Sequence, residues 1–172
     1  MKKILLTGYM GSGKTTIGKE LAIRLNWPYV DLDALIEETL EMSIPTIFET
    51  KGEIFFRKQE HVLLKNCLTE NNSAVISLGG GTPCYANNHV FFENKEVESI
   101  YLKASIETLV ERIKKSGTER PLLKDMEDMP AFIGQHLFER SYYYNHARYR
   151  VTVDHKDIQQ VVNEILDMLS LA

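Results

Sequence analysis

The stretch Gly8-Tyr9-Met10-Gly11-Ser12-Gly13-Lys14-Thr15 decides how the rest of the chain is interpreted. It fits the pattern G-x-x-x-x-G-K-[ST], and it lies between a short apolar run at 3–7 and a helical pattern at 14–25. A glycine-rich loop in this place lets backbone N–H groups surround a phosphate, and the helix N-terminus adds positive potential. The stretch therefore predicts a strand, a nucleotide-binding phosphate loop and a helix.

Two side chains of this loop carry chemistry. Lys14 is expected to bridge the β- and γ-phosphates of a nucleotide, and the Thr15 hydroxyl is expected to ligate Mg²⁺. The alternative is an ordinary glycine-rich turn followed by a helix. The residues that we expect to bind ATP here are Gly11, Ser12, Gly13, Lys14, Thr15 and Thr16.

Length and composition narrow the class of protein. The chain has 172 residues, 44% of them hydrophobic, which predicts a single domain spanning 1–172. Its formal net charge of −4 argues against a general binder of nucleic acid or of an anionic membrane. The apolar run near the N-terminus is too short for a secretory signal, and its two cysteines make no disulfide framework. We expect a cytoplasmic protein.

Short apolar runs alternate with helical patterns along the chain, which indicates βαβ units and a mostly parallel sheet covered on both faces. The expected fold is therefore α/β. We expect strands at 3–7, 29–31, 74–78, 99–102 and around Val151 and Val153, and helices at 14–25, from 34 to 40, 54–68, from 106 through 113, and 158–169.

The segment 116–130 interrupts this alternation. It carries Gly117, two prolines and six charged residues, with little helical periodicity. A polar loop of this length in a compact domain is typically functional or disordered. The hypothesis is a mobile lid over an active site, and the alternative is a frayed loop.

Two acidic residues, Asp31 and Asp33, come at the end of the second expected strand. Ligands of open α/β sheets collect at the carboxyl ends of strands, and alternate residues of an extended segment point the same way. One carboxylate could order hydrated Mg²⁺ while the other accepts a proton from an attacking hydroxyl. The alternative is that Asp33 merely caps the following helix.

Further on, Arg57 follows an apolar pair on an expected helix, and Glu60 lies one turn beyond it, close enough to orient it. A planar guanidinium can grip a carboxylate with two parallel hydrogen bonds. The alternative is a surface ion pair. After the third strand, Gly79, Gly80 and Gly81 remove all side chains, so that a ligand can approach the backbone closely.

Together these residues make the chain similar to the shikimate kinase family. The phosphate loop, Asp-x-Asp, Gly-x-x-x-Phe-Arg, Gly-Gly-Gly and a later Arg-Pro-Leu-Leu at 120–123 stand in the family's order and at its spacings, from residue 4 to about 154. The resemblance implies a three-layer α/β/α fold of the nucleoside-monophosphate-kinase type, with a five-stranded parallel sheet. It also implies a monomer that transfers the γ-phosphate of ATP to the 3-hydroxyl of shikimate, on the route to chorismate and the aromatic amino acids.

The resemblance also assigns roles to individual residues. Asp33 would hold the shikimate hydroxyls and act as base, and Asp31 would act on Mg²⁺ through water. Arg57, with Glu60 beside it, and Arg140 would bind the shikimate carboxylate. Gly79, Gly80 and Gly81 would line the ring, with Gly80 the expected direct contact. Arg120 would move onto the phosphates with the lid, and Arg112 would lie against the adenine.

The chain departs from the family pattern near Arg140. The family usually shows Arg, a Tyr four residues later and an Ala four residues beyond that, whereas here Arg140 and Tyr144 fit but the alanine comes one position early, at Ala147. Taking Tyr143 as the match restores the spacing to Ala147 and shortens the gap to Arg140. A one-residue slip between helix and strand would account for either alignment.

Three rival functions remain open from sequence. Gluconate-type and nucleoside-monophosphate kinases share the phosphate loop, yet neither explains Arg57 together with the triple glycine. A nucleotide-dependent interaction module would not need Asp-x-Asp, and no guanine-specifying Asn-Lys-x-Asp stretch is present.

Overall fold

The computed structural model describes residues 2–116 and 128–170. In these parts of the chain, five parallel strands form one sheet in the order β2-β3-β1-β4-β5. The fold is thus the α/β class predicted from sequence. The strands are β1 (Lys3–Thr7), β2 (Tyr29–Asp31), β3 (Ala74–Ser77), β4 (Val97–Lys103) and β5 (Tyr149–Thr152).

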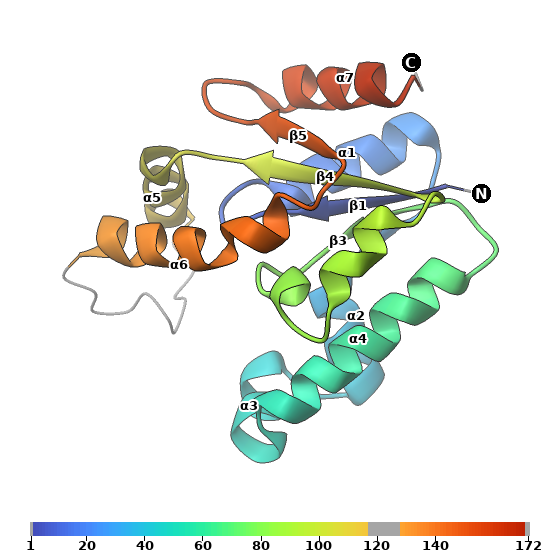
Figure 1. The fold of residues 1–172 in the computed structure, drawn as a ribbon, viewed down its shortest axis with the longest axis vertical. Helices are drawn as coiled ribbons and strands as arrows, with labels where there is room; N and C mark the ends of the chain where they lie inside the picture. The colour runs from blue at the N-terminus through green and yellow to red at the C-terminus, as the bar shows by residue number, and fades with distance from the viewer. Residues whose placement is uncertain (1, 117–127, 171–172) are drawn as a thin grey trace.

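Helices lie on both faces of this sheet, with α7 at the top of Figure 1 and α3 and α4 at the bottom. Two short 3₁₀ turns, Thr82–Cys84 and Asn88–Glu93, connect β3 to β4. The helices are α1 (Lys14–Leu25), α2 (Leu32–Leu40), α3 (Ile44–Lys51), α4 (Glu53–Thr69), α5 (Ile106–Lys115), α6 (Met129–Tyr144) and α7 (Ile158–Leu169).

The alternation of side chains along the central strand produces the three layers. Ile4 and Leu6 on β1 face a core cluster with α1, α5 and α7, whereas Leu5 between them faces a second cluster with α2, α3 and α4. All three side chains are fully buried. Strands buried on both faces are continuously apolar, which explains why β1 appeared in the sequence as a short unbroken run.

Most expected elements are confirmed, and the differences have local causes. Helix α2 begins at Leu32 rather than at residue 34, because the Asp31 side chain accepts a hydrogen bond from the Ala34 amide and starts the helix early. Helix α3 was not predicted, although Ser43 caps it and a proline occupies its first turn. The last two residues of the expected loop at 116–130, Met129 and Pro130, belong to α6.

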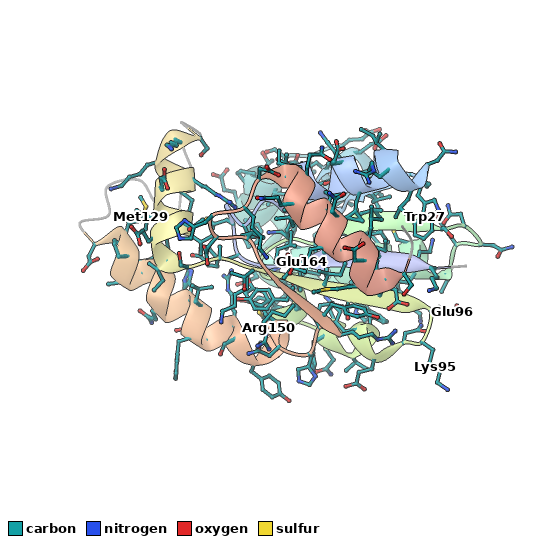
Figure 2. The ribbon with its side chains drawn as sticks, turned by 90° about the horizontal axis from the view of Figure 1, so that it is seen from above. Trp27, Lys95, Glu96, Met129, Arg150 and Glu164 are labelled. Carbon is teal, nitrogen blue, oxygen red and sulfur yellow. The ribbon has the colours of Figure 1, made fainter. Side chains whose placement is uncertain are left out.

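The parallel strands give the molecule two different ends. Figure 2 shows Trp27, Lys95 and Glu96 gathered at one end, where β2 and β4 begin, and Met129 at the other. The phosphate loop and the glycine loop at 79–81 both follow the carboxyl ends of strands, and the other described candidate residues lie on helices or at the end of β2. Across the described residues, no helix combines the length and the apolar character needed to cross a membrane.

Candidate active site

A cleft of about 550 Å³ opens at the carboxyl edge of the sheet. Its walls come from the phosphate loop, from the end of β2, from the loop after β3 and from the segment that joins β5 to α7. This is the position at which open α/β sheets bind ligands. The predicted residues that line it are Gly11, Gly13, Lys14, Thr15, Thr16, Asp31, Asp33, Gly79, Gly80 and Arg112.

The phosphate loop has the geometry of an anion site. Gly13 caps α1 in the left-handed region, at φ +96°, where a residue with a side chain would be strained. The Lys14 ammonium donates to the carbonyl oxygens of Gly8, at 2.8 Å, and Tyr9, at 3.1 Å. Ser12 is 1% exposed and does not line the cleft. Only the backbone of Ser12 is therefore suited to the predicted contact with ATP.

The two predicted metal ligands lie side by side. The Thr15 hydroxyl donates to Asp31 Oδ2 at 3.2 Å, and the Tyr29 hydroxyl donates to the same oxygen at 3.2 Å. The other Asp31 oxygen caps α2. An alcohol oxygen and a carboxylate oxygen at the mouth of a phosphate loop are the hard donors that Mg²⁺ prefers. The residues present therefore fit this ion.

Asp33 lies in the first turn of α2, and not in an extended segment as the sequence analysis assumed. The alternative that Asp33 caps this helix is wrong, because Asp31 does so. Burial, together with the charges of Glu60 and Asp31, raises the pKa of Asp33 to about 6, although Lys14 and Arg57 oppose the shift. A carboxyl group with this pKa is suited to accept a proton near neutral pH.

Arg57 is held from several sides. Its Nη1 donates to Glu60 Oε2 at 2.9 Å, its Nε to Glu53 Oε1 at 3.4 Å, and its guanidinium carbon lies 3.9 Å from the ring centroid of Tyr85. The Glu60 side chain is only 1% exposed, and its other oxygen accepts a 2.6 Å hydrogen bond from Thr82. The pair is therefore no surface ion pair, and Glu60 supports Arg57 from behind.

The triple glycine brings three predicted side chains together. A Cβ added at Gly79 would lie 2.7 Å from Asp33 Oδ1, and one at Gly81 would lie 3.0 Å from Arg57 Nη2. Gly80 has more room, because a Cβ added there would lie 3.6 Å from Arg140 Nη1. Glycine at 79 and 81 is thus what allows the carboxylate and the guanidinium to approach the loop.

The structure also fixes the register of α6. Tyr144 is fully buried, and its hydroxyl donates to the Gly80 carbonyl at 2.5 Å. It lies one turn after Arg140 on the face that meets the glycine loop. Tyr144 and not Tyr143 therefore accompanies Arg140, and the early Ala147 follows the turn that ends the helix, where its amide donates to the Tyr144 carbonyl.

Of the two arginines expected to bind ATP, the structure describes only Arg112. Arg112 joins the phosphate loop to the segment after β5, because it donates to the carbonyl oxygens of Gly11, Ser12 and Val153 at 3.2–3.4 Å. It lines the cleft, and its expected contact with adenine stays a prediction. Arg120, like most of the predicted lid at 116–130, lies outside the described residues.

One wall of the cleft, the segment between β5 and α7, was not predicted from the sequence. Asp157 and Gln160 form a capping box that starts α7, with Asp157 facing the cleft. The signal was available, since an Asp three residues before a Gln at the start of a helical apolar pattern is typical of this motif. The missed lining residues of this wall are Val153, Lys156, Asp157, Ile158 and Val161.

Fold and cleft together define a P-loop kinase, with the phosphate loop and the acidic residues Asp31 and Asp33 lining the same cleft. The model of the shikimate kinase family matches residues 10–170. The chain belongs to this family of ATP-dependent kinases. It is 50% identical to the shikimate kinase of Flavobacterium psychrophilum, over 98% of this chain and 99% of that protein.

Two solved structures extend the comparison. The shikimate kinase from Bacteroides thetaiotaomicron superposes with a TM-score of 0.91 at 35% identity, covering 99% of both chains. The shikimate kinase from Acinetobacter baumannii, solved in complex with shikimate, superposes with a TM-score of 0.87 at 30% identity, covering 99% of this chain and 93% of that one. Both agree with the family assignment.

Proposed function

We propose that this chain transfers the γ-phosphate of ATP to the 3-hydroxyl of shikimate, giving shikimate 3-phosphate and ADP for the biosynthesis of chorismate and the aromatic amino acids. One observation carries the proposal. The glycine loop at 79–81 adjoins the phosphate-loop cleft, and Asp33, Arg57 and Arg140 all approach it. A nucleotide and a small carboxylic acid would thus meet at one place.

The acceptor side suits a hydroxylated acid. Arg57 and Arg140 approach adjacent glycines, so that two guanidinium groups are available to one carboxylate. The glycines of the loop present no side chain to the ring of the acid. The support from Glu60 and Tyr85 fixes the direction of Arg57 before the acid arrives, which reduces the entropy lost on binding.

Asp33 is the proposed base. Its carboxylate lies beside Gly79, within the cleft that Lys14 also lines, so it can orient the attacking hydroxyl and accept its proton. Phosphoryl transfer needs little covalent help, and positioning and charge stabilisation supply most of the catalysis. Lys14 would stabilise the negative charge on the transferred group.

Thr15 and Asp31 are the proposed residues for Mg²⁺, Thr15 directly and Asp31 through water. The ion would neutralise charge on the β- and γ-phosphates when bound. The hydrogen bond between these two residues keeps both oxygens at the mouth of the loop. Arg112 and the β5–α7 segment would surround the adenine, because they close the same cleft beyond the loop.

We also propose that the protein acts as a monomer in the cytoplasm, with no nucleic acid or membrane partner. ATP, the proposed phosphate donor, is present in the cytoplasm. Both cysteines are free thiols in the structure, which agrees with a reducing compartment. Light scattering on the purified protein, with and without ATP and shikimate, tests the monomer.

The test of the activity is coupled ATP turnover with Mg²⁺, with shikimate, gluconate, AMP or no acceptor added. The parent protein is compared with Arg57→Ala and with Arg24→Ala, an exposed arginine at the far end of α1. We expect turnover to require shikimate, to collapse in Arg57→Ala and to persist in Arg24→Ala. Equal turnover without any acceptor, or a preference for gluconate or AMP, would refute the assignment.

A further inference from the structure

Tyr9, the second residue of the phosphate loop, has no role in the function proposed above. Its side chain is 1% exposed and belongs to the core cluster that also contains Ile133 of α6. The guanidinium carbon of Arg140 lies 5.5 Å from the ring centroid. A guanidinium within about 6 Å of an aromatic ring centroid is attracted by the negative face of the ring. The ring therefore supports Arg140 from one side.

The hydroxyl of Tyr9 is tied to the helix that carries Arg140. It shares a 3.0 Å hydrogen bond with His136 Nδ1, although the two residues are 127 positions apart. His136 packs in turn against Phe132, with ring centroids 4.1 Å apart. Burial, followed by the charge of Arg140, lowers the pKa of His136, which favours a neutral imidazole with an acceptor nitrogen.

Three residues of α6 share this face at a spacing of four. His136 holds the Tyr9 hydroxyl, Arg140 lies over the Tyr9 ring, and Tyr144 donates to the Gly80 carbonyl. Residues four apart lie above one another on a helix. Arg140 is thus flanked along the helix by two residues that bond to the two loops of the cleft.

We propose that Tyr9 is a positioning residue for Arg140, with its ring supporting the guanidinium and its hydroxyl fixing that ring to α6 through His136. The inference rests on the proposed function in one respect, the binding of the acceptor carboxylate by Arg140. A guanidinium held in place before the acid arrives loses less freedom on binding. Tyr9 thereby acts on shikimate affinity although it belongs to the nucleotide loop.

The experiment is a double-mutant cycle between Tyr9 and Arg140. Tyr9→Phe removes the hydroxyl and keeps the ring, and Tyr9→Leu removes both, each in the parent protein and in Arg140→Ala. Tyr142→Phe is the matched control, because it removes a phenol hydroxyl from an exposed position on the same helix. Shikimate KM and Kd, ATP KM, kcat and Tm are measured for each protein.

In the parent background, we expect Tyr9→Leu to raise shikimate KM and Kd about tenfold, which lies between the values expected for an exposed and for a fully desolvated cation–π contact. Tyr9→Phe raises them about threefold, as expected for one lost hydrogen bond. ATP KM stays within about twofold, and Tyr142→Phe changes none of these constants. In the Arg140→Ala background, Tyr9→Leu changes shikimate Kd less than about twofold, because the two residues act as a unit.

Additive effects of Tyr9→Leu and Arg140→Ala would overturn the inference and leave Tyr9 as ordinary packing. So would an equal rise in the ATP and shikimate constants. If Arg140→Ala alone leaves shikimate Kd unchanged, the carboxylate role of Arg140 fails, and the inference fails with it. If Tyr9→Leu does not fold, His136→Leu breaks the same link without altering the phosphate loop, and an unchanged shikimate Kd in that variant contradicts the proposal.

Discussion

Asp33 combines a place in the cleft with an unusual acidity. Its pKa rises to about 6 from an ordinary value of 3.8, chiefly through burial and then through the charges of Glu60 and Asp31. Ionisation of this carboxyl group is therefore harder in the folded protein than in the unfolded chain. The same feature that suits Asp33 to accept a proton thus reduces the stability of the fold.

Replacement of Asp33 by Asn separates these two effects. We expect Asp33→Asn to lower kcat by about 10²–10⁴-fold, as for loss of a general base. At pH 8 the free energy of unfolding of the variant should exceed that of the parent by about 1–2 kcal/mol. This value is less than the full pKa shift corresponds to, because the site is partly exposed. Activity assays and denaturant unfolding at two pH values measure both.

The pH dependence has a definite sign. Below pH 3.8 the carboxyl group is protonated in both states, so the penalty is absent; it develops as pH rises and is complete above about 6. The stability advantage of Asp33→Asn should therefore shrink towards pH 4. The kcat/KM of the parent should fall as pH drops through about 6. A variant more stable by the same amount at both pH values would contradict the proposed pKa.

Local patterns predicted some of these residues and could not predict others. Lys14 and Thr15 follow from a contiguous loop, and Asp31 and Asp33 from their place after a strand. The contact between Tyr9 and His136 joins residues 127 positions apart, so no periodicity or spacing indicates it. Such pairs are decided by how α6 packs against the loops, which is a property of the tertiary fold.

The loop after β3 works as a unit in which each glycine has its own neighbour. Gly79 lies against Asp33 and Thr82, Gly81 lies against Arg57, and Gly80 faces a more open space. The sequence predicted the need for close approach here. It did not indicate which glycine meets which side chain, because α2, α4 and α6 all have to be in place before these neighbours exist.

Alanine at two positions of this loop should have different consequences. Gly79→Ala places a methyl group 2.7 Å from Asp33 Oδ1 and 3.0 Å from Thr82 Oγ1, so we expect a loss of stability of about 1–3 kcal/mol. In Gly80→Ala the added methyl group meets nothing closer than 3.6 Å, so the free energy of unfolding should change by less than about 0.5 kcal/mol.

For Gly80→Ala, we expect an effect on shikimate binding rather than on stability. If this backbone lines the acceptor site, Gly80→Ala raises shikimate KM while Tm stays near that of the parent. Thermal unfolding and steady-state kinetics on the two variants provide the comparison. Equal stability losses in both would show that the loop is not held against Asp33 as described.

Boundaries of helices were harder to predict than their existence. Asp31 and Asp33 are both residues that favour a helix N-cap. Asp31 is the cap because the Ala34 amide lies within hydrogen-bond distance of its side chain. The unpredicted α3 is eight residues long and buries Ile47 beneath its neighbours. A helix this short gains its stability from packing rather than from its own residues, so its sequence pattern is weak.

In the proposed function, nucleotide and acceptor would bind against different groups of elements. The β5–α7 segment and Arg112 line the part of the cleft that we propose for the nucleotide. Arg57 belongs to α4, whose buried residues pack in the core cluster on the opposite face of the sheet. The two ligands should therefore stabilise the protein separately.

Thermal shifts test this separation. At about 100 times its Kd, either a non-hydrolysable ATP analogue with Mg²⁺ or shikimate should raise Tm by about 5–10 °C. Arg57→Ala should abolish the shift with shikimate and keep the shift with the nucleotide. Chelation of Mg²⁺ should reduce the nucleotide shift alone. Loss of both shifts in Arg57→Ala would indicate that this residue supports the fold rather than the acid.

The position of Lys14 has a consequence for selectivity among anions. Its ammonium group is already solvated by two carbonyl oxygens of its own loop, which act as an internal substitute for water. An incoming phosphate must compete with these oxygens for the N–H groups of Lys14, so part of the gain from a single small anion is offset. A nucleotide adds contacts along the rest of the cleft and overcomes the exchange. The enzyme should therefore still bind ATP in the presence of inorganic phosphate, without a separate device to exclude that ion.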